Sequence, residues 1–226
     1  MKPANARLNR REFLKGCAGA AAALPYLGAA PRLLRHRDSR PHLIFIVTDA
    51  LRYDHVGANG YYRDTTPELN GWVAGMGVTF RNATSAAAWT FPATAAMMTG
   101  RLPVRLSANW NHTTLPAGVP TLAERLAAAG YTTAGFTCAP FSRANRGLGR
   151  GFAVYDDSLA LLPLDAQGQA AQLNALAQQW LAAWQDADPL FLFLYYFDVH
   201  TWYHPPAQYN VRYDATYTGA LTPAAY

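Results

Sequence analysis

The chain has 226 residues, of which 51% are hydrophobic and 13% aromatic, so it has the apolar material for the core of one ordinary domain and is not a disordered chain. Its formal net charge is +5, but residues 1–40 contain nine Lys/Arg and two acidic residues, whereas the other 186 residues contain ten Lys/Arg and twelve acidic residues, a net charge of −2. Because the excess positive charge lies in the amino-terminal segment, we expect no nucleic-acid partner for the body of the protein.

Residues 1–30 have the features of a twin-arginine signal peptide. Residues 9–15 read NRREFLK, which matches the twin-arginine export consensus, and an Ala/Gly/Leu-rich run follows from residue 16 to Ala30. This run is shorter and less apolar than a membrane span, so we expect cleavage after Ala30, with retention as an anchor as the alternative. The prediction makes the twin-arginine export machinery a partner and places the mature protein in the periplasm or outside the cell.

The folded part is expected to begin at His42. Residues 31–41 read PRLLRHRDSRP and have neither helical nor strand periodicity, which predicts a linker. Residues 42–48 then form the apolar run HLIFIVT, which ends in Asp49. Such a run predicts a parallel strand covered on both faces, with Asp49 at its carboxyl tip.

Strands and helices are predicted to alternate along the rest of the chain. Pro, Thr and Gly residues mark the helix ends, and continuous apolar runs mark the strands. The predicted helices cover residues 65–75, 92–100, 121–130 and 165–186, and the predicted strands cover residues 78–80, 131–137 and 190–197. This order predicts an α/β fold in which helices flank a mostly parallel sheet.

Four side chains are candidates for a ligand site at one edge of this sheet. Ligands of open α/β sheets gather beyond the carboxyl ends of the strands, where Asp49 follows the first strand and Asp198 and His200 follow the last. Thr90 precedes the helix expected near Pro92, whose free N–H groups attract a tetrahedral anion. A threonine hydroxyl needs a base or a metal ion to become a nucleophile, and Asp49 offers the oxygen ligands that Ca²⁺, Mg²⁺ or Mn²⁺ prefer.

The segment 89–100, WTFPATAAMMTG, resembles the nucleophile motif of the sulfatase family, which reads C-x-P-S-R followed four residues later by T-G. The Pro, the spacing and the Thr-Gly keep the register of the motif. Thr90 stands at the Cys position, Ala93 at the Ser position and Thr94 at the Arg position.

Other segments resemble this family in the same order along the chain. They are residues 49–57, 66–69, 121–131 and 197–206, so the resemblance extends over about residues 42–214. The family belongs to the alkaline phosphatase superfamily. The resemblance therefore implies an alkaline phosphatase-like sandwich, with residues 42–226 as the amino-terminal part of a sulfatase-like catalytic domain and the fold incomplete.

The resemblance also implies roles for individual residues. Asp49 matches an aspartate that binds a divalent metal ion (Ca, Mg, Mn or Zn), Thr90 matches the nucleophile, and His200 matches a histidine that contacts the ester. Ala50 stands where many members have a second acidic ligand. Because threonine cannot be oxidised to formylglycine, the chemistry of a standard sulfatase is disfavoured, and a phosphate ester is a better candidate than a sulfate ester of a small molecule, glycan or lipid.

A second, unrelated hypothesis is that the chain is a catalytically inactive truncated fragment or a binding module. Members of the family use a later Asp-His or Asp-Asn pair for the metal, and no such pair follows Tyr213. Without the resemblance, Asp49 would be read as a turn cap, Thr90 as a helix cap and His200 as part of an aromatic loop.

The segment 138–143, CAPFSR, resembles the C-x-P-S-R motif with one residue inserted. We expect Cys138 to be a small buried residue and not a nucleophile. The other cysteine, Cys17, lies in the predicted signal peptide, so the mature chain can form no internal disulfide.

Overall fold

The computed structural model of the protein describes residues 40–164, 166, 168–185, 188–201 and 209. The predicted signal peptide and all but the last two residues of the predicted linker lie outside these residues. None of the described helices has both the length and the apolar content needed to cross a membrane.

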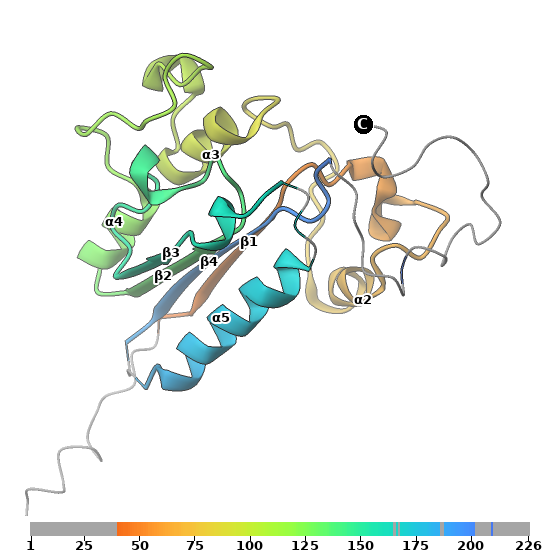
Figure 1. Ribbon diagram of the computed structural model, residues 1–226. Coiled ribbons are helices and arrows are strands. Elements are labelled where there is room, and N and C mark those ends of the chain that lie inside the picture. The colour runs from red at the N-terminus through yellow and green to blue at the C-terminus, as the bar shows by residue number, and fades with distance from the viewer. Residues whose placement is uncertain (1–39, 165, 167, 186–187, 202–208, 210–226) are drawn as a thin grey trace, which may run out of the picture. The chain divides into compact units, whose positions relative to one another are not determined.

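The centre of the fold is a parallel sheet (Figure 1). Its strands are β1 (Leu43–Thr48), β2 (Thr132–Thr137), β3 (Val154–Asp156) and β4 (Leu190–Tyr196), in the spatial order β1-β4-β2-β3. The central strand β4 pairs with β1 from Leu43↔Phe191 to Thr48↔Tyr196. Because every described strand runs in the same direction, the carboxyl ends meet at one edge, and the prediction of an α/β fold with a parallel sheet is confirmed.

Helices cover both faces of the sheet, with α5 on one side and α3 and α4 on the other (Figure 1). The described helices are α2 (Pro67–Met76), α3 (Thr90–Thr99), α4 (Leu122–Ala128) and α5 (Gln169–Ala183), together with the 3₁₀ turns η2 (Tyr53–His55), η3 (Gly57–Asn59), η4 (Pro103–Leu106), η5 (Ala144–Arg146) and η6 (Leu159–Leu161). Successive residues of a strand point to opposite faces. The Tyr196 hydroxyl accordingly donates to Asn174 Oδ1 of α5 at 2.6 Å, whereas Tyr195 lies on the α3 side.

The hydrophobic core forms around β4, whose residues 190–195 are all buried. Phe191 and Phe193 pack with Phe91 and Met98 of α3 on one side, and Leu173 of α5 belongs to the same buried cluster. Each of these side chains is almost fully removed from water, which stabilises the fold by roughly 1.5–3 kcal/mol per side chain.

Three predictions about local structure were wrong. Residues 78–80 form no strand, and the Val78 and Phe80 side chains are exposed, because no neighbouring strand pairs with them. β1 is not covered on both faces, since Ile44 is 61% exposed and Ile46 50% exposed on this edge strand. The sequence analysis also missed β3, which has only three residues.

A complete capping box begins α4. The Thr121 hydroxyl accepts a hydrogen bond from the Glu124 N–H at 3.1 Å, and the Glu124 carboxylate accepts one from the Thr121 N–H at 2.7 Å. The same hydroxyl donates to the Arg150 carbonyl at 2.9 Å, which links α4 to the loop before β3. Thr121 is fully buried, so water cannot replace these bonds.

We predict that Thr121→Ala lowers the free energy of unfolding by about 1–2 kcal/mol, because the variant loses the cap and leaves buried backbone groups unpaired. Urea unfolding followed by circular dichroism measures the change. Thr121→Ser keeps the hydroxyl and serves as the matched control. An equal loss in both variants would contradict the role of the cap.

Candidate active site

Asp49 lies at the carboxyl edge of the sheet, directly after β1. Its N–H donates to the Tyr196 carbonyl at 2.9 Å, so the pairing of β1 with β4 holds the backbone of Asp49 in place. The next residue, Ala50, has φ = 57°, a left-handed conformation that costs a non-glycine residue on the order of 1–3 kcal/mol. The chain therefore turns sharply away from the sheet immediately after the carboxylate.

Thr90 is the first residue of α3 and lies next to Asp49. Its hydroxyl donates to Asp49 Oδ2 at 2.9 Å. The expected helix start near Pro92 was two residues too late. Pro92 fits in the first turn because the N–H groups there have no partner within the helix, so the missing N–H of proline is not needed.

Tyr195 of β4 completes the surroundings of this carboxylate, and the sequence analysis missed it. Its hydroxyl donates to the same Asp49 Oδ2 at 3.2 Å. Burial and the nearby negative charge of Asp49 raise the pKa of Tyr195 well above its ordinary value, so the phenol stays a neutral donor at physiological pH. Among the described residues, Asp49 Oδ1 accepts no hydrogen bond, which leaves one carboxylate oxygen available to a cation or a ligand.

His200 reaches the same cavity from the loop after β4. Its N–H donates to the Phe197 carbonyl at 2.9 Å, and its ring stacks on the Phe197 ring with the centroids 4.3 Å apart. His200 Nδ1 lies 2.9 Å from the Thr201 carbonyl oxygen. The Thr201 hydroxyl lies 3.2 Å from the same nitrogen, so Nδ1 is occupied by Thr201, and Nε2 has no hydrogen-bond partner among the described residues.

A cavity of about 480 Å³ joins these three predicted site residues. Its lining comes from the end of β1, the segment before α3, the first two turns of α3, β4 and the loop after β4. The lining residues are Val47, Thr48, Asp49, Ala50, Leu51, Ser85, Ala87, Ala88, Trp89, Thr90, Ala93, Met97, Tyr195 and His200. The structure thus brings Asp49, Thr90 and His200 together, although they are far apart in the sequence.

Asp198, by contrast, does not line this cavity. Its Oδ1 accepts a hydrogen bond from the Ala170 N–H at 3.0 Å, in the first turn of α5. A carboxylate in this position stabilises the positive end of a helix. The expectation that Asp198 and His200 face one ligand was therefore wrong for Asp198.

Thr94 stands where the sulfatase-like motif has an anion-binding arginine, and it cannot replace that arginine. Thr94 is fully buried, and its hydroxyl donates to the Thr90 carbonyl one turn earlier, at 2.8 Å. No Lys or Arg is among the lining residues of the cavity. Among the described residues, the amino terminus of α3 is one source of positive potential for an anion at this cavity.

Cys138 is buried at the end of β2, as predicted. It is 1% exposed, and its Sγ lies 3.7 Å from the Gln169 carbonyl oxygen. Burial raises the pKa of the Cys138 thiol to about 12, with the negative charge of Asp198 contributing in the same direction. A thiol in this state is a poor nucleophile.

The residues present fit part of a divalent metal site. The free carboxylate oxygen of Asp49 and the adjacent hydroxyl of Thr90 are hard oxygen donors of the kind preferred by Ca²⁺, Mg²⁺ and Mn²⁺. Within the described residues, no group of three or more His, Cys, Asp and Glu side chains is placed to hold a metal ion. If a divalent ion binds here, Asp49 would supply one of its ligands, and water, substrate oxygens or other residues would supply the rest.

Comparisons with known proteins show the family and the fold. A sequence model of the sulfatase family matches residues 41–222. Arylsulfatase A of Bos taurus is 38% identical over 101 residues, which cover 42% of this chain and 20% of that protein, and arylsulfatase A of Homo sapiens is 36% identical over 99 residues, which cover 41% and 19%. The matched segments thus span about a fifth of the length of these relatives.

Solved structures of low sequence identity share the fold. A phosphonate monoester hydrolase of Agrobacterium radiobacter has a TM-score of 0.62 at 21% identity, over 76% of this chain and 43% of the other. The carboxy-terminal periplasmic domain of the phosphoethanolamine transferase EptC of Campylobacter jejuni has a TM-score of 0.51 at 17% identity, over 75% and 49%. These likenesses concern the fold alone.

We predict that Cys138 resists modification in the folded protein. In a Cys17→Ser background, its reaction with a thiol reagent such as DTNB at pH 8 should be more than about 100-fold slower than in urea-unfolded protein, because the native thiol is both shielded and protonated. Absorbance of the released thiolate measures the rate. Equal rates in the folded and unfolded states would contradict the burial of Cys138.

A second prediction concerns the stability of the protein at alkaline pH. Because the pKa of Tyr195 is higher in the folded state than in the unfolded state, its contribution to stability is complete below pH 10 and is lost as the pH rises through the folded-state pKa. We expect Tyr195→Phe to reduce the loss of stability between pH 9 and pH 11.5 in urea-unfolding experiments. The exposed Tyr62 provides the control variant Tyr62→Phe. An unchanged pH dependence in Tyr195→Phe would contradict the prediction.

Proposed function

The chain belongs to the sulfatase family, and on that premise we propose that it is an exported, metal-dependent ester hydrolase with Thr90 as its nucleophile. The observation that supports this most directly is the 2.9 Å hydrogen bond from the Thr90 hydroxyl to Asp49 Oδ2, in a cavity that His200 also lines. A nucleophile hydrogen-bonded to a carboxylate, beside an imidazole, is an arrangement suited to ester cleavage.

The proposed reaction begins at Thr90 Oγ1, which attacks the phosphorus or sulfur atom of the ester. The hydroxyl proton passes to Asp49 Oδ2, which already accepts it as a hydrogen bond, and Tyr195 keeps this carboxylate in position from the other side. The bond from the central atom to the alcohol oxygen breaks, and the alcohol leaves with a proton taken from solvent. Water then attacks the phosphorus or sulfur atom of the ester formed on Thr90, and the bond to Thr90 Oγ1 breaks. Thr90 Oγ1 takes its proton back from Asp49, and the attacking water gives one proton to solvent, which replaces the proton taken by the alcohol.

His200 and the amino terminus of α3 bind the substrate in this proposal. Nε2 of His200 is free of internal hydrogen bonds in the described structure and contacts the ester group. The unpaired N–H groups in the first turn of α3 attract the negative oxygens of the substrate. A divalent ion on Asp49 would add positive charge and lower the pKa of the hydroxyl.

Phosphate esters are the preferred substrate class. A sulfatase of the standard kind needs an aldehyde made from Cys or Ser, and Thr90 cannot supply it. Fold neighbours named as a phosphonate monoester hydrolase and a phosphoethanolamine transferase act on phosphorus compounds, which supports the choice. Sulfate esters remain the second substrate class, in line with the names of the arylsulfatase relatives.

The alternative is a protein that binds esters without cleaving them. The observation favouring it is Thr94, which stands where the family has an arginine and is buried away from the cavity. On this alternative, the cavity would bind a sulfate or phosphate ester and release it unchanged. The hydrolase proposal and this alternative both include export of the protein, because the export prediction rests on the NRREFLK segment at residues 9–15.

Hydrolysis of 4-nitrophenyl phosphate, bis(4-nitrophenyl) phosphate and 4-nitrophenyl sulfate by the full-length protein tests the proposal. We expect Thr90→Ala to lower kcat by on the order of 10³-fold, because no other hydroxyl is hydrogen-bonded to Asp49 except that of Tyr195 in the described structure. A chelator should abolish the activity, and added divalent ions should restore it.

Thr99→Ala is the matched control, since Thr99 lies at the opposite end of α3 and its hydroxyl donates only to the Ala95 carbonyl of the same helix. This variant should keep the wild-type rate. Full activity in Thr90→Ala would show that Thr90 is not the nucleophile. Ester binding without turnover by the wild-type protein would favour the non-catalytic alternative.

A further inference from the structure

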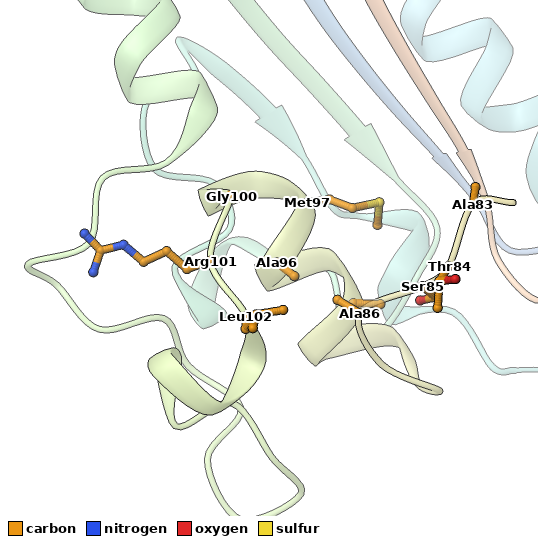
Figure 2. Close-up of a pocket in the computed structure, with 10 residues that line it drawn as sticks. Ala83, Thr84, Ser85, Ala86, Ala96, Met97, Gly100, Arg101 and Leu102 are labelled. Atoms are coloured by element: carbon orange, nitrogen blue, oxygen red, sulfur yellow. The ribbon is translucent and has the colours of Figure 1, made fainter. Parts of the chain in front are cut away.

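A second hollow, of about 530 Å³, lies along α3, and residues that line it are drawn in Figure 2. It shares Ser85, Ala93 and Met97 with the lining of the candidate active site, so the two cavities are neighbours. We propose that this hollow is the subsite for an apolar alcohol portion, aromatic or alkyl, of the ester. The inference rests on the proposed function and assigns the class of substrate.

The position of the hollow along α3 fits a group attached to an ester at Thr90. Residues at i, i+3 and i+7 of a helix share one face, and Thr90, Ala93 and Met97 have this spacing. An ester whose central atom is bonded to Thr90 Oγ1 has its alcohol within reach of Ala93 and Met97. The hollow then continues past Ala96 to Leu102, as Figure 2 shows.

The face of α3 that borders the hollow is apolar where a surface helix is normally polar. The opposite face packs into the core through Phe91, Ala95 and Met98. The bordering face contributes Ala93, Ala96 and Met97, and Met97 is 37% exposed. Covering this exposed apolar surface removes it from water, so an apolar ligand has a favourable binding surface here.

Most residues that line the hollow are apolar or small, its hydroxyl groups are those of Thr84 and Ser85, and Arg101 is the one charged residue among them. Its lining contains no carboxylate, and the Ser85 hydroxyl already donates to the Ala87 carbonyl at 2.6 Å. In Figure 2 the Arg101 side chain extends away from Met97 and from the segment containing Ala83 to Ala86. A volume of about 530 Å³ is within the range typical of sites for small organic ligands, roughly 300–1,000 Å³.

Calorimetric titration of the full-length protein with 2-naphthol, an uncharged aromatic alcohol, tests the subsite independently of catalysis. We expect saturable binding that Thr90→Ala leaves unchanged. Ala96→Trp should weaken this binding by roughly tenfold or more, because the indole occupies the space of the ring. The same variant should lower kcat/KM for 2-naphthyl phosphate relative to methyl phosphate by a similar factor.

Leu102→Ser tests the subsite with a substitution at an exposed position that leaves the core intact, since Leu102 is 63% exposed. This variant should weaken 2-naphthol binding several-fold. The matched control is Val104→Ser, which also replaces an exposed apolar residue, at 80% exposure, but does not line the hollow. Val104→Ser should bind 2-naphthol as the wild-type protein does.

The outcomes separate this inference from the proposed function. If 2-naphthol does not bind, or if Ala96→Trp and Leu102→Ser bind it as tightly as the wild-type protein, the subsite is refuted even when Thr90-dependent hydrolysis is found. If 2-naphthol binds and both variants weaken it, but no ester is cleaved, the hollow is confirmed as an apolar binding site and the hydrolase proposal fails.

Discussion

The candidate site depends on the register between β1 and β4. Parallel pairing places Thr48 opposite Tyr196, and the N–H of Asp49 adds one further hydrogen bond to the Tyr196 carbonyl. This register sets the Asp49 carboxylate beside the Tyr195 hydroxyl and below the start of α3. A shift of one residue would send Tyr195 to the α5 face and leave Asp49 without that donor.

The central strand β4 supports one side of the site. β4 is buried and paired on both edges, and its aromatic side chains pack against α3 on one face, while α5 covers the other. His200 and the loop after β4 start from this fixed strand. On the β1 side, Ile44 and Ile46 are exposed, so the two strands that hold the site differ in how well they are covered.

The sequence was most informative where an element is long or a motif has a fixed spacing. The apolar runs located β1, β2 and β4, and the sulfatase-like spacing located Thr90. β3 was missed because three residues, Val154–Asp156, carry too little periodicity to be recognised. Residues 78–80 were misassigned because β-branched and aromatic residues favour a strand only when a neighbouring strand is available to pair with them.

For the site too, the sequence indicated individual residues better than the contacts between them. Asp49, Thr90 and His200 were predicted from motif order and line one cavity, but the partnership of Tyr195 with Asp49 depends on strand register and on the face to which each side chain points. Asp198 was misplaced because its side chain turns back to the start of α5, and its sequence position next to the site does not reveal this.

The left-handed conformation of Ala50 has a consequence for how this site relates to the rest of the family. Many members have an acidic residue at this position, and aspartate tolerates φ near 57° better than most residues other than glycine. The backbone at Ala50 therefore already has a conformation that an aspartate accepts. A single substitution, Ala50→Asp, would add a second carboxylate directly after Asp49 without requiring a new backbone conformation.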